Sequence, residues 1–310
     1  MFSVIFPGQG SQIVGMGKEF HSKFEIVKNL FDEADKALGF SISDLILNGP
    51  KEKLDLTENT QPAIFLVGYS IFQVIKKENN IDLNKANFFA GHSLGEYTAL
   101  ACAEALSFNS TIKILKIRGQ AMQSAVPKGQ GGMVAVLGSE IEKIEKIIKK
   151  NENKYKCYIA NDNSNGQIVV SGNNKDIDIF ILDLKKESIK SIKLPVSAPF
   201  HCHLMKKATN IMSSEIQKLD IKDPKNSLIS NVTGTEITNS SLLKDLLVKQ
   251  IENRVRWRES VLFMINKGVN NFIEIGPGKV LSGLIKRINK DVKVSAINNQ
   301  EDINLINIDD

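Results

Sequence analysis

Apolar residues recur along the chain with two different spacings, one typical of helices and one typical of buried strands. Residues 24–39 carry apolar side chains three or four positions apart and end in glycine, which predicts an amphipathic helix with a C-terminal glycine. Residues 60–77 are apolar on most sides from Pro62 onward. We therefore expect a buried helix with Pro62 at its first position.

Short apolar runs predict the strands of a sheet, and several are followed by a glycine-bearing turn and then a helical pattern. The runs are residues 4–6, 88–90, 228–230, 272–275 and 292–297. Strands that alternate with helices in this way are typical of an α/β fold with a mainly parallel sheet covered on both faces. We expect an α/β-hydrolase-like large domain.

The pattern changes between residues 127 and 196. Strands are predicted at residues 131–138, 156–162, 166–172 and 191–196, and helices at residues 140–151 and 176–187. The order βαββαβ is that of a ferredoxin-like unit. We therefore expect a small ferredoxin-like domain at 127–196, inserted into a catalytic domain formed by 1–126 and 197–310, with a ligand cleft between the two. The polar tail after Asn298 is expected to be loosely held.

The composition narrows the possible function classes. The 310 residues are 42% hydrophobic and 24% charged, the range of a soluble globular protein, and the formal net charge is +5. The lysines are scattered and often stand beside glutamate, so we expect no nucleic-acid binding. A basic surface would still suit an acidic protein partner.

The cysteines and the absence of long apolar runs indicate a reducing compartment. Cys102, Cys157 and Cys202 stand far apart and form no CxxC motif, which supports neither a disulfide framework nor a zinc site. We expect no metal and no organic cofactor. No run approaches 18 apolar residues, and a strand pattern begins at residue 3, which leaves no room for a signal peptide. A cytoplasmic protein without a membrane anchor is expected.

The segment Gly91-His92-Ser93-Leu94-Gly95 has a strand pattern before it and a helix pattern after it. This is the context of a nucleophile elbow, a turn so sharp that glycines must flank the serine. In that geometry the Ser93 hydroxyl points out of the turn, and the amide of Leu94 faces an oxyanion at the helix N-terminus. A Gly-Ser turn without chemistry is the alternative, and the flanking strand and helix favour the nucleophile.

A nucleophilic serine needs a general base, and the chain contains four histidines. We expect His21 on an exposed helical face. His92 stands next to Ser93, where the two side chains diverge, so we expect it to shape the site. The loop PVSAPFHCHLM offers His201 or His203, and His201 is favoured because His203 begins a helical stretch.

A carboxylate that would complete a triad does not stand out between the serine and this loop. Asp162 is the obvious candidate, but it falls in the inserted domain. A Ser-His pair oriented by a backbone carbonyl or an amide side chain is the alternative. Such a pair would still activate the serine, because the general base does most of the proton transfer.

Arg118 stands in the apolar stripe of a predicted helix, between Leu115 and Met122. A guanidinium that faces inward needs an anion. The anion is either a structural aspartate or glutamate, or the carboxylate of a substrate held bidentately.

Two glycine-rich segments fail the motifs of nucleotide-binding loops. FPGQGSQIVGMG has Ile13 where a dinucleotide fingerprint needs glycine, and EIGPGKVLSGL has Val280 where a Walker A loop needs serine or threonine. We expect the first to be a turn after a strand, whose amides and Gln9 approach an oxyanion formed at Ser93. The second is expected to be a strand-to-helix turn with a structural role.

Seven segments stand in an order and spacing that one family shares. They are FPGQGSQ, TQPA, AGHSLGEYTAL, IRGQAM, PVSAPFHCHLM, Arg256-Trp257 and EIGPGKVLSGL. Together they resemble the malonyl-CoA:acyl carrier protein transacylases of type II fatty acid synthesis, from residue 2 to about residue 297. The resemblance implies a monomer that transfers a malonyl group from malonyl-CoA, through an acyl-serine, to the phosphopantetheine thiol of acyl carrier protein.

The resemblance also implies roles for individual residues. Ser93 matches the acyl-accepting nucleophile, and His201 matches its general base. Gln250 matches the position whose backbone carbonyl orients the histidine. Arg118 matches the arginine that binds the malonyl carboxylate, so the inward cation would find its anion in the substrate.

Further residues are expected around the acyl group. Gln9 and the amide of Leu94 match the oxyanion hole. The side chains of Phe200 and Leu94 resemble the malonyl-selecting forms, because bulky groups there leave little space for an α-methyl branch. A missing methyl pocket discriminates by only about 1 to 3 kcal/mol. Met122 is expected among the substrate-binding residues.

The sequence departs from the family pattern at two positions and offers one candidate docking patch. Asn165 and Arg254 stand where the family usually has proline, and neither matches a catalytic position. The first is expected to loosen a turn of the small domain, and the second to add a cation near the Gln250 segment. Lys286 and Arg287, with Lys290, are candidates for docking an acidic carrier protein, although a solvated helix face would look the same.

Two other functions share parts of this pattern. A serine esterase would use Ser93 and His201 but would give no reason for Arg118. A carrier-protein-binding module would have kept the fold and lost the activity, and the filled catalytic positions disfavour it.

Overall fold

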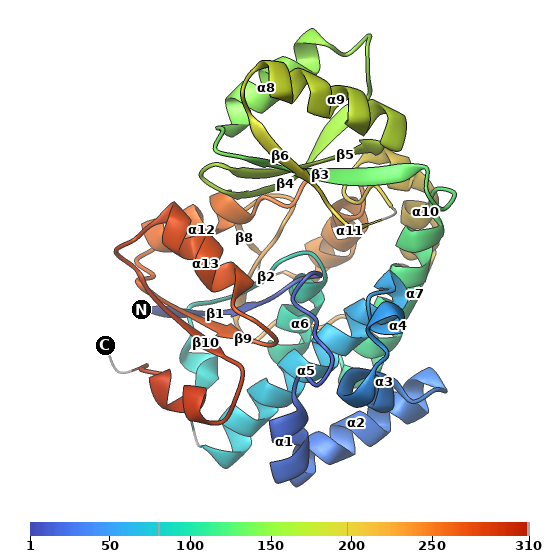
Figure 1. The fold of residues 1–310 in the computed structure, drawn as a ribbon. Coiled ribbons are helices and arrows are strands. Elements are labelled where there is room, and N and C mark those ends of the chain that lie inside the picture. The colour runs from blue at the N-terminus through green and yellow to red at the C-terminus, as the bar shows by residue number, and fades with distance from the viewer. Residues whose placement is uncertain (80, 197, 238, 309–310) are drawn as a thin grey trace.

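Two β-sheets organise the protein (Figure 1). The computed structural model describes residues 1–79, 81–196, 198–237 and 239–308. Within these ranges the larger sheet has six strands, which are parallel except for the last pair. In spatial order they are β10 (Lys293–Ile297), β9 (Asn271–Ile275), β1 (Phe2–Phe6), β2 (Phe88–Gly91), β7 (Ser227–Ile229) and β8 (Glu236–Ile237).

Helices cover both faces of this sheet, because successive strand residues point to opposite sides. Ile5 and Phe88 share a core with helices of residues 257–266 and 280–288, whereas Val4 and Phe89 share a core with helices of residues 57–78, 94–102 and 108–124. The helices outside the smaller sheet's unit are α1 (Lys18–Lys23), α2 (Glu25–Leu38), α3 (Ile42–Asn48), α4 (Lys51–Leu54), α5 (Thr57–Glu78), α6 (Leu94–Cys102), α7 (Phe108–Ser124), α10 (Lys206–Gln217), α11 (Ser240–Gln250), α12 (Trp257–Asn266) and α13 (Val280–Ile288), with short 3-10 turns at Leu83–Lys85, His203–Met205 and Glu301–Leu305. The expected α/β fold is confirmed.

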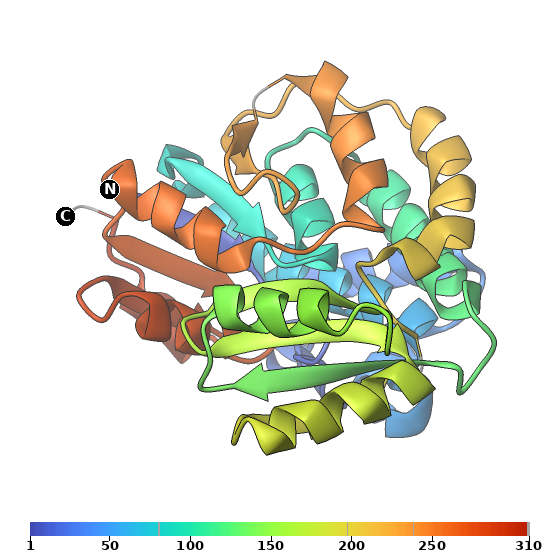
Figure 2. The ribbon, with the colours of Figure 1, turned by 90° about the horizontal axis from the view of Figure 1, so that it is seen from above.

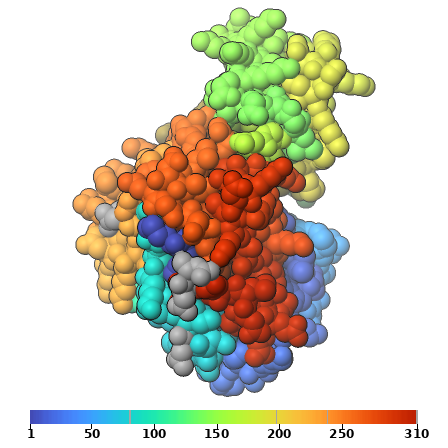
Figure 3. Space-filling model, turned by 90° about the vertical axis from the view of Figure 1, so that its left-hand side faces the viewer, coloured from blue at the N-terminus to red at the C-terminus, as the bar shows by residue number. Residues whose placement is uncertain are grey.

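The smaller sheet belongs to the predicted βαββαβ unit. Its elements are β3 (Gly131–Leu137), α8 (Ile141–Lys150), β4 (Cys157–Ser164), β5 (Gln167–Asn173), α9 (Asn174–Lys186) and β6 (Lys190–Lys193). The strands are antiparallel in the order β4–β5–β3–β6, the ferredoxin-like arrangement. Helices α8 and α9 cover the face turned away from the large sheet (Figure 1 and Figure 2). The unit stands out as a lobe (Figure 3).

The domain boundaries remain a prediction. Residue 197, where the second boundary is expected, lies outside the described residues. The opposite face of the small sheet contributes Met133 and Val169 to the core of the large unit. The two units are therefore packed against each other.

Two expectations about local structure are wrong. Helix α5 begins at Thr57, so Pro62 lies inside it. The residues before the proline join the helix because Asn59 Nδ2 donates to Lys53 O (2.8 Å) and Thr60 Oγ1 donates to Leu54 O (2.6 Å), which ties them to the preceding turn. The described residues after Asn298 are also held, since Glu301–Leu305 form a 3-10 turn in which Ile303 is buried.

Among the described residues, the helices are too short or too polar to cross a bilayer.

Candidate active site

Ser93 lies at the sharp turn between β2 and α6, with a backbone φ of 54°. A positive φ is uncommon for a residue with a side chain, and it turns the hydroxyl away from the strand. The flanking glycines make this turn possible. A Cβ on Gly91 would overlap the backbone of Gly95, and a Cβ on Gly95 would overlap the carbonyl of Phe6. The segment therefore has the geometry of a nucleophile elbow.

His201 lies beside this serine, although it stands 108 positions further along the chain. Its Nε2 is 2.8 Å from Ser93 Oγ, and its Nδ1 is 2.9 Å from the backbone carbonyl of Gln250. A carbonyl only accepts, so Nδ1 carries the proton and Nε2 presents its lone pair to the serine. Burial, and then the charge of Arg118, lower the pKa of His201 to about 3. The imidazole is therefore neutral and able to accept a proton.

The other histidines have different surroundings. His203 is exposed and contacts Tyr158. His92 is directed away from the serine, and its Nε2 lies 2.9 Å from Asn163 Oδ1. His21 is half-buried, with its ring against Phe31 at a centroid distance of 4.9 Å, because helix α1 packs on α2. His21 is therefore less exposed than a position on an open helical face would be.

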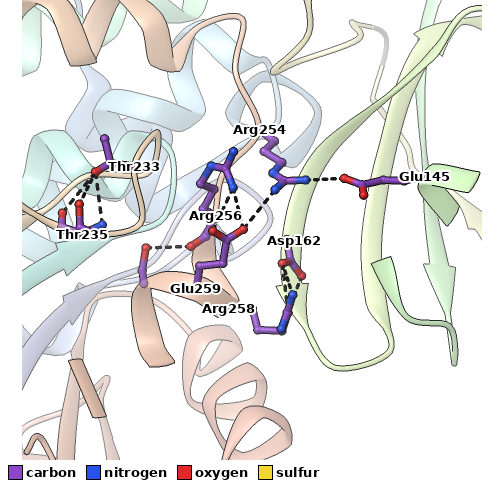
Figure 4. A network of polar contacts seen from close by, with 9 residues as sticks. Glu145, Asp162, Thr233, Thr235, Arg254, Arg256, Arg258 and Glu259 are labelled. Carbon is purple, nitrogen blue, oxygen red and sulfur yellow. Dashed lines mark hydrogen bonds and ion pairs between the residues drawn. The ribbon is translucent and has the colours of Figure 1, made fainter. Parts of the chain in front are cut away.

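Asp162 does not complete a triad with His201. Its carboxylate is bound by Arg258, whose Nε lies 3.0 Å from both carboxylate oxygens. The pair joins the small sheet to α12, and Arg254 makes a second connection through Glu145 and Glu259, at 2.8 and 3.3 Å (Figure 4). These charges join the two units across their interface.

Arg118 lies in the middle of α7 and is only 1% exposed. Its Nη1 donates to Gln61 Oε1 (2.8 Å), and its Nη2 donates to Gln250 Oε1 (2.8 Å) and Ser93 Oγ (3.1 Å). The guanidinium carbon is 5.4 Å from the centre of the Tyr97 ring. Within the described part of the chain the guanidinium forms no ion pair. A structural carboxylate therefore does not occupy it, and neutral oxygens hold a buried cation beside the nucleophile.

The N-terminus of α6 is open toward Ser93 Oγ. Among the described residues, the amide of Leu94 donates no hydrogen bond, as expected for the first residue of a helix without a side-chain cap. Gln9 lines the same pocket as Leu94, and its Nε2 donates to Thr57 Oγ1 at 3.3 Å. An oxyanion formed at the serine would meet this positive helix end.

A cleft of about 690 Å³ opens above the serine, between the two units. Leu94, Met122 and Phe200 line it on the large unit, and Met133, Asn163 and Val169 line it on the small one. Val280, Leu281 and Leu284 of α13 also line it. The EIGPGKVLSGL segment therefore contributes to the cleft as well as to the fold, which its expected structural role did not include.

The sequence did not reveal several polar residues around the elbow. Asn231 Oδ1 accepts from the amide of Ser93 (2.7 Å), and Asn231 Nδ2 donates to Gly91 O (2.7 Å). Glu96 lies buried behind the serine, and Gln61 holds the arginine. Gln61 and Glu96 fall within the family segments, whereas Asn231 has no local signal because it follows a short strand in an ordinary polar loop.

The candidate docking residues are partly engaged in local contacts. Lys286 Nζ donates to the carbonyls of Lys290 (3.2 Å) and Val292 (2.6 Å). Arg287 contacts Gln167 of the small unit. In the described residues, three or more histidine, cysteine or acidic side chains do not group as a metal site would require.

Comparison with known proteins places these observations in a family. Residues 3–304 match the acyl transferase domain. The chain is 42% identical over 304 residues to the malonyl CoA-acyl carrier protein transacylase of Bacillus subtilis, which covers 97% of this chain and 94% of the relative.

Solved structures of similar fold come from the same family. The acyl-carrier-protein-S-malonyltransferase of Bartonella henselae is 40% identical, with a TM-score of 0.95 over 98% of this chain and 97% of that one. A type II PKS acyl-carrier protein in complex with its malonyl-transacylase gives a TM-score of 0.93 at 35% identity, covering 97% of each chain.

Proposed function

The chain belongs to the malonyl CoA-acyl carrier protein transacylase family of acyl transferases, and we propose from this that it moves a malonyl group from malonyl-CoA to acyl carrier protein. The observation that carries the proposal is the buried Arg118, whose Nη2 lies 3.1 Å from Ser93 Oγ. A cation without a carboxylate partner beside a nucleophile suits an acyl group that ends in a carboxylate. A neutral ester has no anionic group that this arginine could bind.

In the first half-reaction, Ser93 Oγ attacks the thioester carbonyl of malonyl-CoA while His201 Nε2 takes its proton. Gln250 O holds the other ring nitrogen and so keeps the base in the required tautomer. The tetrahedral oxyanion lies toward the amide of Leu94 and Gln9. Collapse breaks the carbon–sulfur bond, and CoA leaves as a thiol with the proton from the imidazole. The product is a malonyl ester on Ser93.

The second half-reaction runs the same chemistry in reverse with a different thiol. The phosphopantetheine thiol of the carrier protein gives its proton to His201, attacks the ester carbonyl and releases the serine oxygen, which recovers the proton. The malonyl carboxylate stays on Arg118 throughout.

The walls of the cleft support selection of an unbranched acyl group. Phe200 and the side chain of Leu94 are both buried at the site, and Met122 lines the cleft from the helix of Arg118. We infer that these side chains restrict an α-methyl branch, by about 1 to 3 kcal/mol. We place the enzyme in the cytoplasm as a monomer, with a catalytic domain at 1–126 and 197–310 and an inserted domain at 127–196.

The test of this function compares two acyl donors. In Arg118→Ala the malonyl carboxylate loses its charged partner, so acylation of Ser93 by malonyl-CoA should fall by at least about 100-fold, whereas acylation by acetyl-CoA should change far less. Arg118→Lys keeps the charge without the fork and should fall between the two. Equal losses with both donors would remove the carboxylate role and favour an esterase or an inactive binding module.

A further inference from the structure

A layer of polar side chains lies behind the elbow, on the side away from the cleft. Glu96, in the first turn of α6, is 3% exposed, and Gln250, at the end of α11, is fully buried. Glu96 Oε2 accepts a hydrogen bond from Gln250 Nε2 at 2.6 Å and from the amide of Asn231 at 3.2 Å. Neither Glu96 nor the side-chain amide of Gln250 has a role in the chemistry described above.

Gln250 connects this layer to the reacting groups through both of its ends. Its side-chain Oε1 accepts from Arg118 Nη2 at 2.8 Å, and its Nε2 donates to the backbone carbonyl of Ser93 at 3.0 Å. Its backbone carbonyl is the acceptor for His201 Nδ1. One residue therefore contacts the elements that carry the nucleophile, the base and the arginine.

The orientation of the Gln250 amide is set by its partners and not by its shape, because the oxygen and the NH₂ group have almost the same size. With the oxygen toward Arg118 the contact is attractive. A flipped amide would turn NH₂ toward a guanidinium that only donates. Glu96 Oε2 is the carboxyl acceptor among the partners of Nε2, and its 2.6 Å contact is the shortest of them.

Glu96 keeps this function whether or not it is ionised. The charged or titratable groups that act on it are Arg118 from α7 and the adjacent Tyr97. Burial raises the pKa of Glu96 to about 7, while its hydrogen bonds to Asn231 and Gln250 and the charge of Arg118 oppose that rise. A protonated carboxyl group still has one oxygen that accepts. The length of the Glu96 side chain, which brings its oxygen to Gln250, is therefore more important for this contact than its charge.

We propose that Glu96 is a positioning residue for malonyl selection. It holds the Gln250 amide with its oxygen toward Arg118, and so fixes the guanidinium where the carboxylate of the acyl group must bind. This inference rests on the proposed function, since it concerns the same arginine. Without Glu96 the Gln250 oxygen would no longer be fixed toward the buried arginine, and the guanidinium would no longer be held in one orientation.

Two variants separate reach from charge. Glu96→Gln removes the charge and keeps a carbonyl oxygen at full length, which can accept from both Gln250 and Asn231. Glu96→Asp keeps the charge and shortens the side chain by one methylene, so its oxygen falls short of Gln250. The readout is the rate of Ser93 acylation by malonyl-CoA divided by the rate with acetyl-CoA. We expect Glu96→Asp to lower this ratio about tenfold or more, mainly through KM for malonyl-CoA, and Glu96→Gln to stay within about threefold.

A matched control is available in Glu274, a fully buried carboxylate on β9. Glu274→Asp should lower the stability without changing the malonyl-to-acetyl ratio. A double-mutant cycle adds a second readout: in the Arg118→Ala background, Glu96→Asp should change the ratio less than about twofold, because its effect passes through the arginine.

The outcomes distinguish the inference from the proposed function. A wild-type ratio in Glu96→Asp, a larger loss in Glu96→Gln than in Glu96→Asp, or multiplying losses in the Arg118→Ala background would each overturn the positioning role and leave the function standing. Failure of the wild-type protein to form a malonyl ester would instead overturn the proposed function. If Glu96→Asp does not fold, the Glu96→Gln ratio decides, because a loss above tenfold there contradicts the role.

Discussion

Two strand–turn–helix connections of the same parallel sheet, β2–α6 and β9–α13, differ in how their helices begin. At α13, the carboxylate of Glu274 accepts from the amides of Leu281 (3.1 Å) and Ser282 (2.7 Å). At α6, the amide of Leu94 has no acceptor among the described residues, and the preceding Ser93 is held in a strained backbone conformation. One helix end is closed by the protein, and the other is left open.

The difference shows how one fold element serves either structure or chemistry. An anion at a helix N-terminus is stabilised by the free amides and the helix dipole. In α13 the chain provides that anion itself. In α6 the corresponding buried carboxylate, Glu96, points away from its own helix end toward Gln250, so the amide of Leu94 remains available for a transient oxyanion.

The largest effect on stability and activity is expected from substitution of Gly95, which makes the sharp turn before the open N-terminus of α6 possible. Gly95→Ala places a Cβ on the carbonyl of Phe6, so the elbow must move. We expect a loss of more than about 4 kcal/mol in the free energy of unfolding and no acylation of the serine. Urea unfolding and intact-mass measurement check both. A variant with wild-type stability would show that the turn is not as tight as described.

The next largest effect is expected in the pH dependence of stability, through the buried carboxyl group of Glu96. Because burial raises the pKa of Glu96 from 4.5 to about 7, the folded state binds the proton more tightly than the unfolded state. The stabilisation that the folded wild type gains from this proton is therefore lost as the pH rises from about 4.5 through 7. Glu96→Gln has no such proton and shows no such loss. The difference in unfolding free energy should move in favour of the variant by up to about 3 kcal/mol over this window.

Chemical unfolding of both proteins between pH 4 and 9 provides the measurement. The titration of His201 is present in both proteins and cancels in the difference. A difference that stays constant with pH would contradict the shifted pKa.

Removal of the resident anion at α13 should affect stability and spare selectivity. Glu274→Ala leaves the buried amide of Leu281 and the partly buried amide of Ser282 without their acceptor, which should cost about 2 kcal/mol. The malonyl-to-acetyl ratio should remain that of the wild type, as measured by stopped-flow acylation with each donor. A selective loss of malonyl transfer would mean that α13 takes part in recognition of the acyl group.

The smallest effect is expected for a second glycine-to-alanine substitution, this time in α13, which should raise the stability where Gly95→Ala lowers it. Gly283 lies in α13, and apart from its chain neighbours and the backbone of its own helix, a Cβ there would meet no heavy atom of the described residues within 4 Å. Gly283→Ala should therefore raise the stability by about 0.5 to 1 kcal/mol, since alanine favours helix and reduces the freedom of the unfolded chain. Thermal unfolding checks this value. A destabilised variant would indicate a contact that the open surface does not show.

Much of the fold could be predicted because its signals are local. The inserted βαββαβ unit and the runs of the parallel sheet are visible as periodic patterns, and the elbow is visible as glycines at fixed spacing. The start of α5 was missed because Asn59 and Thr60 join the helix through contacts with the turn before it. Such contacts leave no periodic pattern.

The site could be predicted only in part, because some of its contacts also leave no local pattern in the sequence. Ser93 carries a motif, and Arg118 is conspicuous as a cation in an apolar stripe. The carbonyl of Gln250 was expected from the resemblance alone, and Asn231 was not expected at all, since a backbone carbonyl or a loop amide acts only where the fold places it. Asp162 was considered for the triad from its acidic character, but Arg258 binds it.

The most direct test of the account is the mass of the intact protein after mixing with malonyl-CoA. We predict an increase equal to one malonyl group, carried by the peptide that contains Ser93, absent in Ser93→Ala, and transferred to carrier protein when its phosphopantetheine form is added. Release of free malonate without an adduct, or an adduct that persists in Ser93→Ala, would contradict the malonyl-serine intermediate.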